Sequence, residues 1–423
     1  PHITNEIKDR ILSLGRNKDF DIIITEIGGT VGDIESLPYI EAVRQLKWEL
    51  GSENSLVIHL TLIPYLSAAA ELKTKPTQHS VKTLMESGVN ADIIVCRTEH
   101  KLSNAIKNKI ALFCNVKNEA VIESIDAETI YDVPILMQKE RLDKVVLKKL
   151  RLSTIKSSKM DRWKVFLDKL KNSNKIVKIG LIGKYIELQD SYKSILESLT
   201  HAGVANEVKV KIITIHSESI NDTNLSELLV KLNGIIVAPG FGERGIEGKI
   251  KAIRYSRENN VPFLGICLGM QMAVIEYARN VLKLEDVNST EMKENCKNPI
   301  ISLMENQKSI VNKGGTMRLG AWDCELLKKS KTKKIYNKKV ISERHRHRYE
   351  LNNEYLAQLN KGDLIPSGIN PETNLVEVVE HKEHPWFIGV QFHPEYSSTV
   401  LKPHPLFKSF INSSLENLKN NIN

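Results

Sequence analysis

The stretch Pro262-Phe263-Leu264-Gly265-Ile266-Cys267-Leu268-Gly269-Met270-Gln271 has the pattern of an apolar strand that runs into a turn with a cysteine at its apex. A Gly-x-Cys-x-Gly turn between a strand and a helix is similar to a nucleophile elbow, in which missing side chains let the backbone bend sharply and expose the reactive atom. The helix expected to begin near Leu268 would direct unpaired N–H groups and its positive dipole end at the sulfur, which favours the thiolate. The pattern therefore predicts that Cys267 is a catalytic nucleophile.

A cysteine in an apolar segment is more often a buried small side chain than a nucleophile, so the elbow alone leaves both interpretations open. A second motif favours catalysis, because the apolar segment 387–392 leads directly into His393-Pro394-Glu395. His393 could deprotonate Cys267 and later protonate a leaving amine, while Glu395 would fix the imidazole tautomer. We therefore predict a triad of Cys267, His393 and Glu395.

The elbow cysteine together with the His-Pro-Glu motif resembles the triad-type (class I) glutamine amidotransferases, which hydrolyse glutamine and pass on its ammonia. The segments 265–271 (Gly-Ile-Cys-Leu-Gly-Met-Gln), 288–291 (Asn-Ser-Thr-Glu) and 343–350 (Glu-Arg-His-Arg-His-Arg-Tyr-Glu) together resemble the CTP synthase family. The resemblance implies a ligase that uses ATP and Mg²⁺ to phosphorylate O4 of UTP and then replaces that phosphate with ammonia from glutamine. It also implies GTP as an allosteric activator and a homotetramer.

The chain has 423 residues, of which 41% are hydrophobic and 26% charged, so it has the balance of a soluble globular protein and is too long for one ordinary domain. It contains no apolar run near the roughly 20 residues that span a bilayer, and its first residues do not have the pattern of a secretion signal. Its five cysteines lack paired short spacings, which argues against a disulfide framework and a zinc site. We therefore expect a cytoplasmic protein with two domains and no membrane partner.

The net charge of +9 is concentrated between residues 141 and 175, where twelve Lys and Arg accompany three Asp. This segment lacks Gly and Pro, and Trp163, Phe166, Leu167 and Leu170 follow the spacing of one helix face. The pattern favours an amphipathic connecting helix over a site for a polyanion. We expect no nucleic-acid partner, because the basic excess is confined to this segment.

Residues 1–140 and 176–423 each alternate apolar strand candidates with helical patterns, which is typical of parallel α/β sheets. The strand candidates are 20–27, 56–63, 92–96 and 120–122 in the first region, and 177–182, 208–215, 234–237, 263–266 and 387–392 in the second. We predict two doubly wound, mostly parallel sheets: a P-loop-type synthase (amidoligase) domain over 1–140, a basic helical linker over 141–175 and a glutamine amidotransferase domain over 176–423.

Two loops of the first region carry candidate nucleotide ligands, since functional residues of such sheets follow the strand carboxyl ends. By composition alone, the first loop (25–36) could equally be an ordinary acidic turn, and the second (71–80) an ordinary basic surface loop. The resemblance implies that Glu26 binds Mg²⁺ and that Asp33, Ile34 and Glu35 contact the product nucleotide. It implies further nucleotide-binding residues at Lys73, Thr74, Lys75, Pro76, Thr77 and Gln78 (a UTP loop), at Lys109, and at Ile125, Asp126 and Ala127, which would hold adenine through main-chain groups.

The phosphate loop of the family, with the pattern G-x-x-x-x-G-K-[ST], does not occur in these 423 residues. Because the family opens with this loop, we expect that about its first hundred residues are missing and that ATP phosphates have no lysine-bearing cradle here.

In the second region the loop 238–245 follows a strand and should lie beside the elbow, where one of its N–H groups and that of Leu268 would form an oxyanion hole. The common family pattern Pro-Gly-Gly-Phe-Gly is replaced here by Ala-Pro-Gly-Phe-Gly, and Pro239 has no N–H, so Gly240 is the expected donor. The resemblance implies that Glu291 holds the α-amino group of glutamine and Arg348 its α-carboxylate. The full predicted glutamine site is Gly240, Leu268, Gly269, Met270, Gln271, Glu291 and Arg348.

Two rival functions remain open at this stage. A stand-alone glutaminase or γ-glutamyl hydrolase would account for the triad but not for residues 1–140. A basic nucleic-acid-binding or scaffold protein would account for the net charge, but the charge is confined to one segment without interleaved aromatic residues. The basic run 344–348 could likewise be a solvated strand, a metal site or a nucleic-acid patch.

Overall fold

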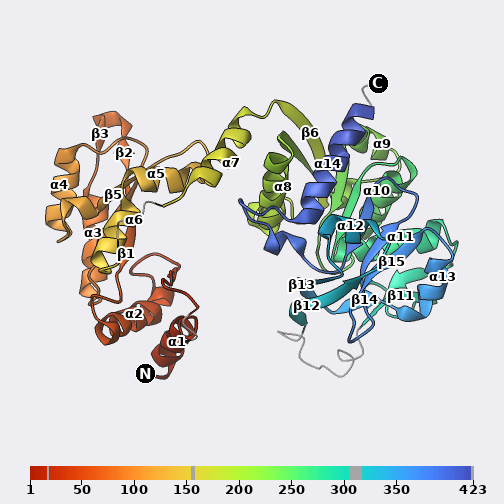
Figure 1. Ribbon diagram of the computed structural model, residues 1–423, viewed down its shortest axis with the longest axis horizontal. Helices are drawn as coiled ribbons and strands as arrows, with labels where there is room; N and C mark the ends of the chain where they lie inside the picture. Colours follow the sequence, from red (N-terminus) through yellow and green to blue (C-terminus); the bar gives the residue numbers. More distant parts are fainter. Residues whose placement is uncertain (17–18, 154–157, 304–316, 421–423) are drawn as a thin grey trace. The chain divides into compact units, whose positions relative to one another are not determined.

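The computed structural model describes residues 1–16, 19–153, 158–303 and 317–420, so residues 154–157 of the expected linker lie outside the described residues. The chain forms two compact units, Pro1–Asp161 and Arg162–Asn423 (Figure 1). Within the described ranges, no helix combines the length and the apolar character needed to cross a bilayer.

The first unit is built on a three-stranded parallel sheet with the order β1-β4-β5. The registers place Ile63, Thr98 and Ile125 side by side, so the carboxyl ends of the three strands share one edge. Its elements are α1 (His2–Ser13), η1 (Ile34–Ser36), α2 (Leu37–Leu50), β1 (Ile58–Ile63), β2 (Tyr65–Leu66), η2 (Ser67–Ala69), β3 (Glu71–Leu72), α3 (Lys75–Glu86), β4 (Ile93–Thr98), α4 (Asn104–Phe113), η3 (Asn118–Ala120), β5 (Val121–Ile125), η4 (Ile130–Asp132), α5 (Val133–Lys139) and α6 (Leu142–Lys149).

Three of the four strands expected in this unit are confirmed as β1, β4 and β5, but the strand expected at 20–27 is wrong. Residues 20–27 are irregular, and the side chain of Ile24 is 91% exposed. An apolar run becomes a strand only where a neighbouring strand accepts its backbone hydrogen bonds and covers one face. None of the described strands pairs with this run, so its apolar composition did not determine its conformation.

The second unit contains a nine-stranded sheet with the order β13-β12-β15-β16-β17-β9-β8-β6-β7. The run β17-β9-β8-β6-β7 is parallel, and the other four pairings are antiparallel. The five strands predicted in this region are all present as the parallel run. The strands are β6 (Lys175–Gly183), β7 (Val208–His216), β8 (Gly234–Val237), β9 (Phe263–Ile266), β10 (Val287–Ser289), β11 (Asn298–Leu303), β12 (Arg318–Leu326), β13 (Val340–His347), β14 (Tyr349–Leu351), β15 (Leu364–Ile369), β16 (Val376–His381) and β17 (Phe387–Val390).

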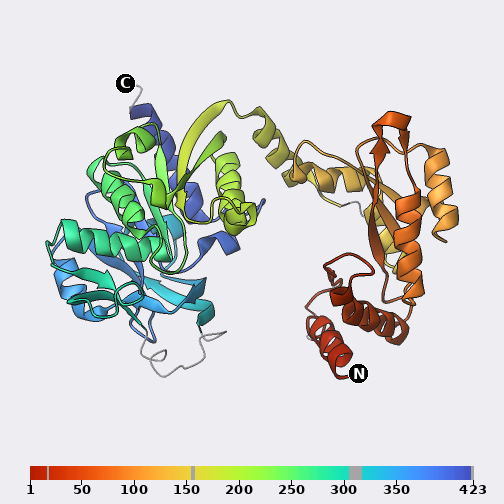
Figure 2. The same cartoon turned by 180° about the vertical axis from the view of Figure 1, so that it is seen from behind.

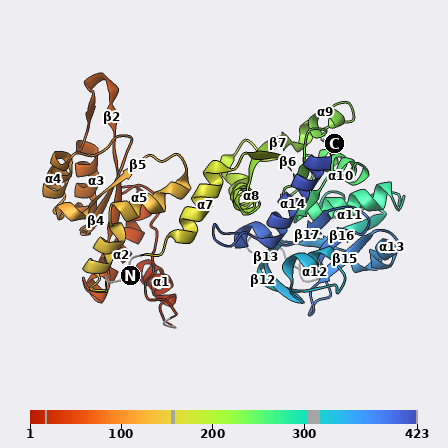
Figure 3. The same ribbon diagram turned by 45° about the horizontal axis from the view of Figure 1, so that its top comes forward.

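Helices cover both faces of this sheet, and each face has its own apolar core (Figure 2). One core joins α10 and α11 to the sheet through side chains such as Ile250 and Phe263, and the other joins α8 and α14 through Leu199 and Phe410. Figure 3 shows α8 and α14 side by side against β6. The helices and turns are α7 (Asp161–Asn172), η5 (Gln189–Tyr192), α8 (Lys193–Ala205), η6 (Ser217–Ser219), α9 (Leu225–Leu229), α10 (Ile246–Glu258), α11 (Leu268–Asn280), α12 (Lys331–Tyr336), η8 (Asn353–Tyr355), α13 (Leu356–Asn360), η9 (Pro394–Ser397) and α14 (Pro405–Asn420).

The amphipathic helix predicted near residue 166 is α7. Its apolar face buries Phe166 and Leu167, and the Phe166 ring meets the His201 ring of α8 edge-on at 6.3 Å between centroids. The basic residues Arg162, Lys164 and Lys171 of α7 are exposed, as the amphipathic pattern requires.

Candidate active site

Cys267 lies at the turn between β9 and α11, with φ 53° and ψ −104°. A positive φ is uncommon for a residue with a side chain, and such conformations concentrate at functional sites where the surroundings enforce them. Here the Cys267 N–H donates to the Val390 carbonyl at 2.7 Å, and the Cys267 carbonyl accepts from the Met270 N–H at 3.1 Å. The strained turn is therefore held by β17 on one side and by α11 on the other.

The two glycines of the elbow are required by close packing. A Cβ on Gly269 would overlap the carbonyl oxygen of Val237 at the end of β8. A Cβ on Gly265 would lie 2.7 Å from the Gly269 carbonyl carbon and oxygen. Any side chain at either position would push α11 away from the sheet and move the sulfur.

His393 and Glu395 follow β17 and are adjacent and buried, with exposed fractions of 5% and 6%. The His393 Nδ1 lies 2.7 Å from Glu395 Oε1, which orients the imidazole. Burial acts to lower the pKa of His393, but the nearby Cys267 and Glu395 outweigh it and raise that pKa above its usual value. In the described part of the chain the His393 Nε2 is buried and has no hydrogen-bond partner.

The loop 238–245 after β8 is held at four points. The Ala238 N–H donates to the Ile182 carbonyl at 2.9 Å, and the Gly242 N–H donates to Glu291 Oε1 at 2.7 Å. Two lysines bind its carbonyls: Lys249 Nζ donates to Ala238 O at 2.9 Å, and Lys184 Nζ donates to Phe241 O. The loop is thus fixed by groups from β6, α10 and the segment after β10.

Two backbone donors remain available between these anchors. Among the described residues, no acceptor receives a hydrogen bond from the N–H of Gly240 or of Leu268. A Cβ on Gly240 would lie 3.6 Å from Leu268 Cδ2, so the two residues are neighbours. Two unpaired N–H groups beside a thiol can stabilise the negative oxygen of a tetrahedral intermediate.

Three of the predicted glutamine ligands, Glu291, Arg348 and Gln271, interact with Tyr349. Burial raises the pKa of the Tyr349 phenol, and the Glu291 carboxylate adds to this effect while the Arg348 guanidinium opposes it. Glu291 and Arg348 therefore both act on the same ring. Gln271 Nε2 donates to the Tyr349 carbonyl at 2.8 Å, which links this group to the elbow helix.

A buried amide, Gln391, lies directly against the nucleophile. Gln391 Nε2 donates to Cys267 Sγ at 3.6 Å, and Gln391 Oε1 accepts from Gln271 Nε2 at 3.1 Å. Gln391 stands within the quoted stretch before His393, yet sequence reasoning assigned it no role, because an amide in an apolar strand carries no signal by itself.

The basic run 344–348 alternates between solvent and core. His345 and His347 point inward from β13, while Arg344 and Arg346 are exposed. Together with Glu377 of β16, the two histidines could offer ligand atoms to a metal ion. However, Arg318 Nη1 already binds Glu377 Oε1 at 2.7 Å, and His345 Nε2 lies 2.7 Å from the other carboxylate oxygen. Because a guanidinium already neutralises this carboxylate, we assign the cluster to a buried ion-pair network.

In the first unit, the predicted UTP loop and the predicted adenine segment both lie at the carboxyl edge of the sheet. The Lys73 N–H donates to Pro64 O at 2.9 Å after β1, and the Asp126 N–H donates to Thr98 O at 3.0 Å after β4. Lys75 begins α3 and is exposed, so a lysine and the positive end of a helix dipole coincide there. This combination suits a phosphate group.

Other predicted nucleotide residues are placed differently. Thr77 is buried and its hydroxyl donates to Thr61 Oγ1 and Leu62 O, so it anchors α3 on β1. Glu26 and Glu35 are exposed, and Asp33 Oδ2 accepts from the Thr30 N–H at 3.1 Å. Lys109 is exposed on α4. The described residues show no contact that joins Glu26 or Lys109 to the edge of the sheet.

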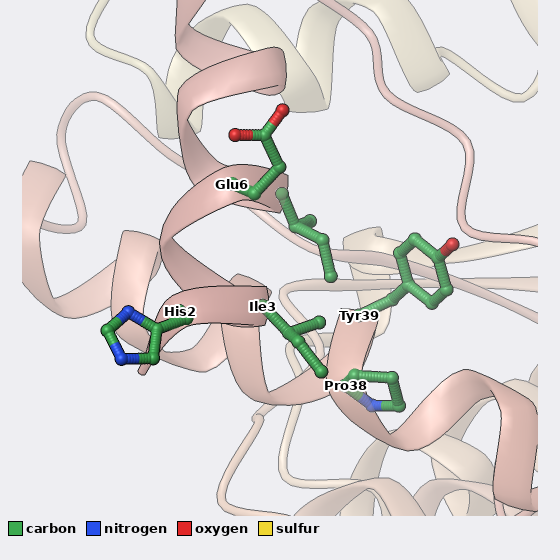
Figure 4. Close-up of a pocket in the computed structure, with 6 residues that line it drawn as sticks. His2, Ile3, Glu6, Pro38 and Tyr39 are labelled. Carbon is green, nitrogen blue, oxygen red and sulfur yellow. The ribbon is translucent and has the colours of Figure 1, made fainter.

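A shallow cavity in the first unit lies between α1 and α2 (Figure 4). Ile3, Ile7, Pro38 and Tyr39 form its apolar part, with His2 and Glu6 at its margin. It contains none of the predicted site residues, and we assign no chemistry to it.

Comparisons with known proteins were made for both units. A family model for the CTP synthase N-terminus matches residues 1–152, and one for class-I glutamine amidotransferases matches residues 187–413. The CTP synthase of Christiangramia forsetii is 67% identical over 416 residues, which are 98% of this chain and 76% of that protein. The CTP synthase of Flavobacterium johnsoniae is 65% identical over 411 residues, 97% of this chain and 76% of the relative. The chain belongs to the CTP synthase family.

A solved structure also resembles the second unit. The glutaminase domain of a Trypanosoma brucei CTPS, determined with bound acivicin, is 38% identical, with a TM-score of 0.53 over 57% of this chain and 94% of that one. The predicted fold class is thereby confirmed, with a CTP synthase N-terminal unit and a class I amidotransferase unit. As a CTP synthase family member, the chain is a glutamine-hydrolysing ligase whose substrates are ATP, UTP and glutamine.

Two lysines at the site were missed by the sequence analysis. The side chains of Lys184 and Lys249 are only 5% and 0% exposed, and both bind carbonyl groups of the loop 238–245. A signal for Lys249 was present, because it lies three residues after Ile246 and four before Ile253 on the apolar face of α10. The resemblance to the CTP synthase family had not led us to assign a role to either lysine.

Proposed function

We propose that this CTP synthase family member releases ammonia from glutamine at Cys267, with His393 as the general base and acid and Glu395 as its orienting partner. The observation that carries the proposal is the buried contact between His393 and Glu395, 2.7 Å long, beside a cysteine held at positive φ. A structural cysteine requires neither a strained turn nor an oriented imidazole next to it.

The order of events follows from these groups. His393 takes the thiol proton, and the thiolate attacks the glutamine amide carbon to form a tetrahedral oxyanion next to the N–H groups of Gly240 and Leu268. His393 then returns the proton to the departing nitrogen, so ammonia leaves and a thioester remains on Cys267. Water, deprotonated by His393, attacks the thioester and releases glutamate.

Recognition of the amino-acid part of glutamine is assigned to the groups around Tyr349. Glu291 would hold the α-amino group and Arg348 the α-carboxylate, with Gly269, Met270 and Gln271 along the side chain. The charges are complementary, and a guanidinium binds a carboxylate through two parallel hydrogen bonds. Since Glu291 also accepts from the Gly242 N–H, substrate binding would act on the loop that carries Gly240.

In the first unit we assign UTP to residues 73–78, with Lys75 and Lys109 as cations for its triphosphate. We assign adenine to residues 125–127 at the same edge of the sheet, and the product nucleotide to residues 33–35. Glu26 would supply a carboxylate to Mg²⁺. An exposed single carboxylate fits this ion, which usually takes one or two protein carboxylates together with phosphate oxygens and water. When bound, Mg²⁺ neutralises charge on the phosphates during transfer.

Three further assignments follow from the family. A homotetramer agrees with the exposed apolar row of Ile58, Leu60 and Leu62 on β1, which association would cover. A reducing, cytoplasmic location agrees with five cysteines that are all free. Activation by GTP is tested by measuring glutamine hydrolysis with and without the nucleotide. We also propose domain limits of 1–140 and 176–423 with a linker between them.

The test of the catalytic assignment is Cys267→Ala. It should abolish the release of glutamate from glutamine, because the reaction begins with attack by the thiol. Cys296→Ala is the matched control, since Cys296 is a half-buried cysteine outside the site. Glutamine hydrolysis within tenfold of the unsubstituted enzyme in Cys267→Ala would rule out this nucleophile.

A further inference from the structure

A lysine lies inside the apolar face of α10. Lys249 is 0% exposed and is flanked on the same face by the buried Ile246, Ile250 and Ile253. Its Nζ donates a hydrogen bond to the Ala238 carbonyl at 2.9 Å. Burial of an ammonium group is costly unless a negative group compensates it, so the position of this side chain needs an explanation beyond packing.

The explanation is not a buried salt bridge to a carboxylate. In the described portions of the chain, no Asp or Glu forms an ion pair with Lys249. Burial and the nearby Lys184 together lower the pKa of Lys249 to about 7, while Cys267 acts in the opposite direction and raises it. The negative charge that Lys249 can meet is therefore the thiolate.

The ammonium group also adjoins the predicted oxyanion hole. A Cβ placed on Gly240 would lie 3.8 Å from Lys249 Nζ and 3.6 Å from Leu268 Cδ2. Gly240 is thus bordered by the start of α11 and by the buried cation. The bond from Lys249 to Ala238 fixes the loop two residues before Gly240, and the bond from Lys184 to Phe241 fixes it one residue after.

We propose that Lys249 is a positioning residue for glutamine hydrolysis, whose buried ammonium stabilises negative charge on Cys267 and on the tetrahedral oxyanion and holds the loop so that the Gly240 N–H stays beside Leu268. The inference rests on the proposed role of Cys267. It adds a cation that is part of neither the elbow motif nor the His-Pro-Glu motif.

The charges around Lys249 define its effect on the reaction. Lys184 reaches it from the end of β6 and Cys267 from the turn before α11. Before attack, Lys249 favours the thiolate over the thiol, because opposite charges attract more strongly between two buried groups than in water. During attack, the negative charge moves from sulfur to the carbonyl oxygen beside Gly240, which keeps it close to the same ammonium.

The test replaces Lys249 by methionine, which has a similar length and no charge, and uses Lys251→Met as the control. Lys251 lies on the same helix but pairs with the exposed Asp222 at the surface. The rate of Cys267 alkylation by iodoacetamide is measured from pH 5 to 10 by mass spectrometry of the Cys267 peptide. Lys249→Met should raise the midpoint of this profile by about one pH unit, as expected on loss of a nearby opposite charge.

The same variants are assayed for glutamine hydrolysis. Lys249→Met should lower kcat by about tenfold to a hundredfold with little change in KM, since the ammonium acts on the reacting charge rather than on bound glutamine. Lys251→Met should leave both the midpoint and kcat as they are. A midpoint shift below about 0.2 units together with a kcat within twofold would overturn the proposal, whereas an active Cys267→Ala would instead overturn the assigned nucleophile.

A measurement on the unsubstituted chain covers the case in which Lys249→Met does not fold. In the chain with ¹³C-labelled lysine, Lys249 should titrate near neutral pH by NMR, far below the exposed lysines. Because coupling between two sites is reciprocal, alkylation of Cys267 should lower the midpoint of this titration. An unchanged midpoint after alkylation would refute the coupling.

Discussion

The oxyanion hole can be tested at Gly240, because the structure separates the role of its N–H from the role of its missing side chain. Pro239 has no N–H, and the N–H groups of Gly240 and Leu268 donate to no acceptor among the residues that the structure describes. Gly240→Pro removes the Gly240 donor. Gly240→Ala keeps that donor and adds a Cβ.

The steric part of the change is small. A Cβ at position 240 would meet Lys184 Cε at 3.4 Å, Leu268 Cδ2 at 3.6 Å and Lys249 Nζ at 3.8 Å, which are ordinary contacts. The loss of one donor from an oxyanion hole costs about 10² to 10³ in kcat, or about 3 to 4 kcal/mol. We therefore expect Gly240→Pro to lose about that factor and Gly240→Ala to lose no more than about tenfold.

The assay is release of glutamate from glutamine at saturating substrate, with circular dichroism and thermal unfolding as checks of the fold. The ratio of kcat between Gly240→Ala and Gly240→Pro measures the contribution of the N–H alone, because both variants carry a Cβ. If the two variants have the same kcat, the donor is not at Gly240. Pro239→Gly then becomes informative, since a rise in activity would place the productive donor one residue earlier.

Three further outcomes follow from the geometry. His393→Ala should slow Cys267 alkylation by about 10² to 10⁴ and Glu395→Gln by less; equal rates in His393→Ala and the unsubstituted chain from pH 6 to 9 would exclude His393 as the base. Gly269→Ala should destabilise the fold by about 1 to 3 kcal/mol in chemical unfolding, because its Cβ would overlap the Val237 carbonyl, and an unchanged unfolding midpoint would contradict this. The pKa of Lys249 is lowered to about 7 from 10.5, so the unfolded chain binds more protons between these values and stability contributed by this residue rises with pH. Lys249→Met should therefore raise the free energy of unfolding more at pH 6 than at pH 10. An equal increase at the two pH values would refute the lowered pKa of Lys249.

The triad pattern was recognisable from the sequence because each of its parts is local. The elbow needs glycines at two fixed offsets from Cys267, and the orientation of His393 needs a carboxylate two residues later. Both conditions are satisfied within short segments, and parallel pairing of β17 with β9 brings the two segments together. The five parallel strands of the second unit were predictable for the same reason, since each is a short apolar run bounded by turns.

The segment 20–27 shows where this reasoning fails. Its run of isoleucines has the composition of a buried strand, but Ile24 is almost fully exposed and the segment pairs with none of the described strands. β1 is similar in composition and is a strand because β4 pairs with it in register from Ile58 to Ile63. The difference lies in long-range pairing, which composition does not encode.

Lys249 illustrates a second limit of prediction from the sequence, and this residue also bears on the mechanism of glutamine hydrolysis. The spacing of Ile246, Lys249, Ile250 and Ile253 predicts that the lysine lies on the buried stripe of a helix. That spacing cannot predict full burial, because a lysine on such a stripe usually extends its ammonium to the water. Here the ammonium is retained by a carbonyl on the preceding loop, and Cys267 on the following turn acts on it electrostatically and raises its pKa. The electrostatics of Cys267 thus depend on a residue outside both catalytic motifs. A fold that carried only the elbow and the His-Pro-Glu segment would reproduce the proposed triad and lack the cation, so its cysteine would react more slowly at neutral pH.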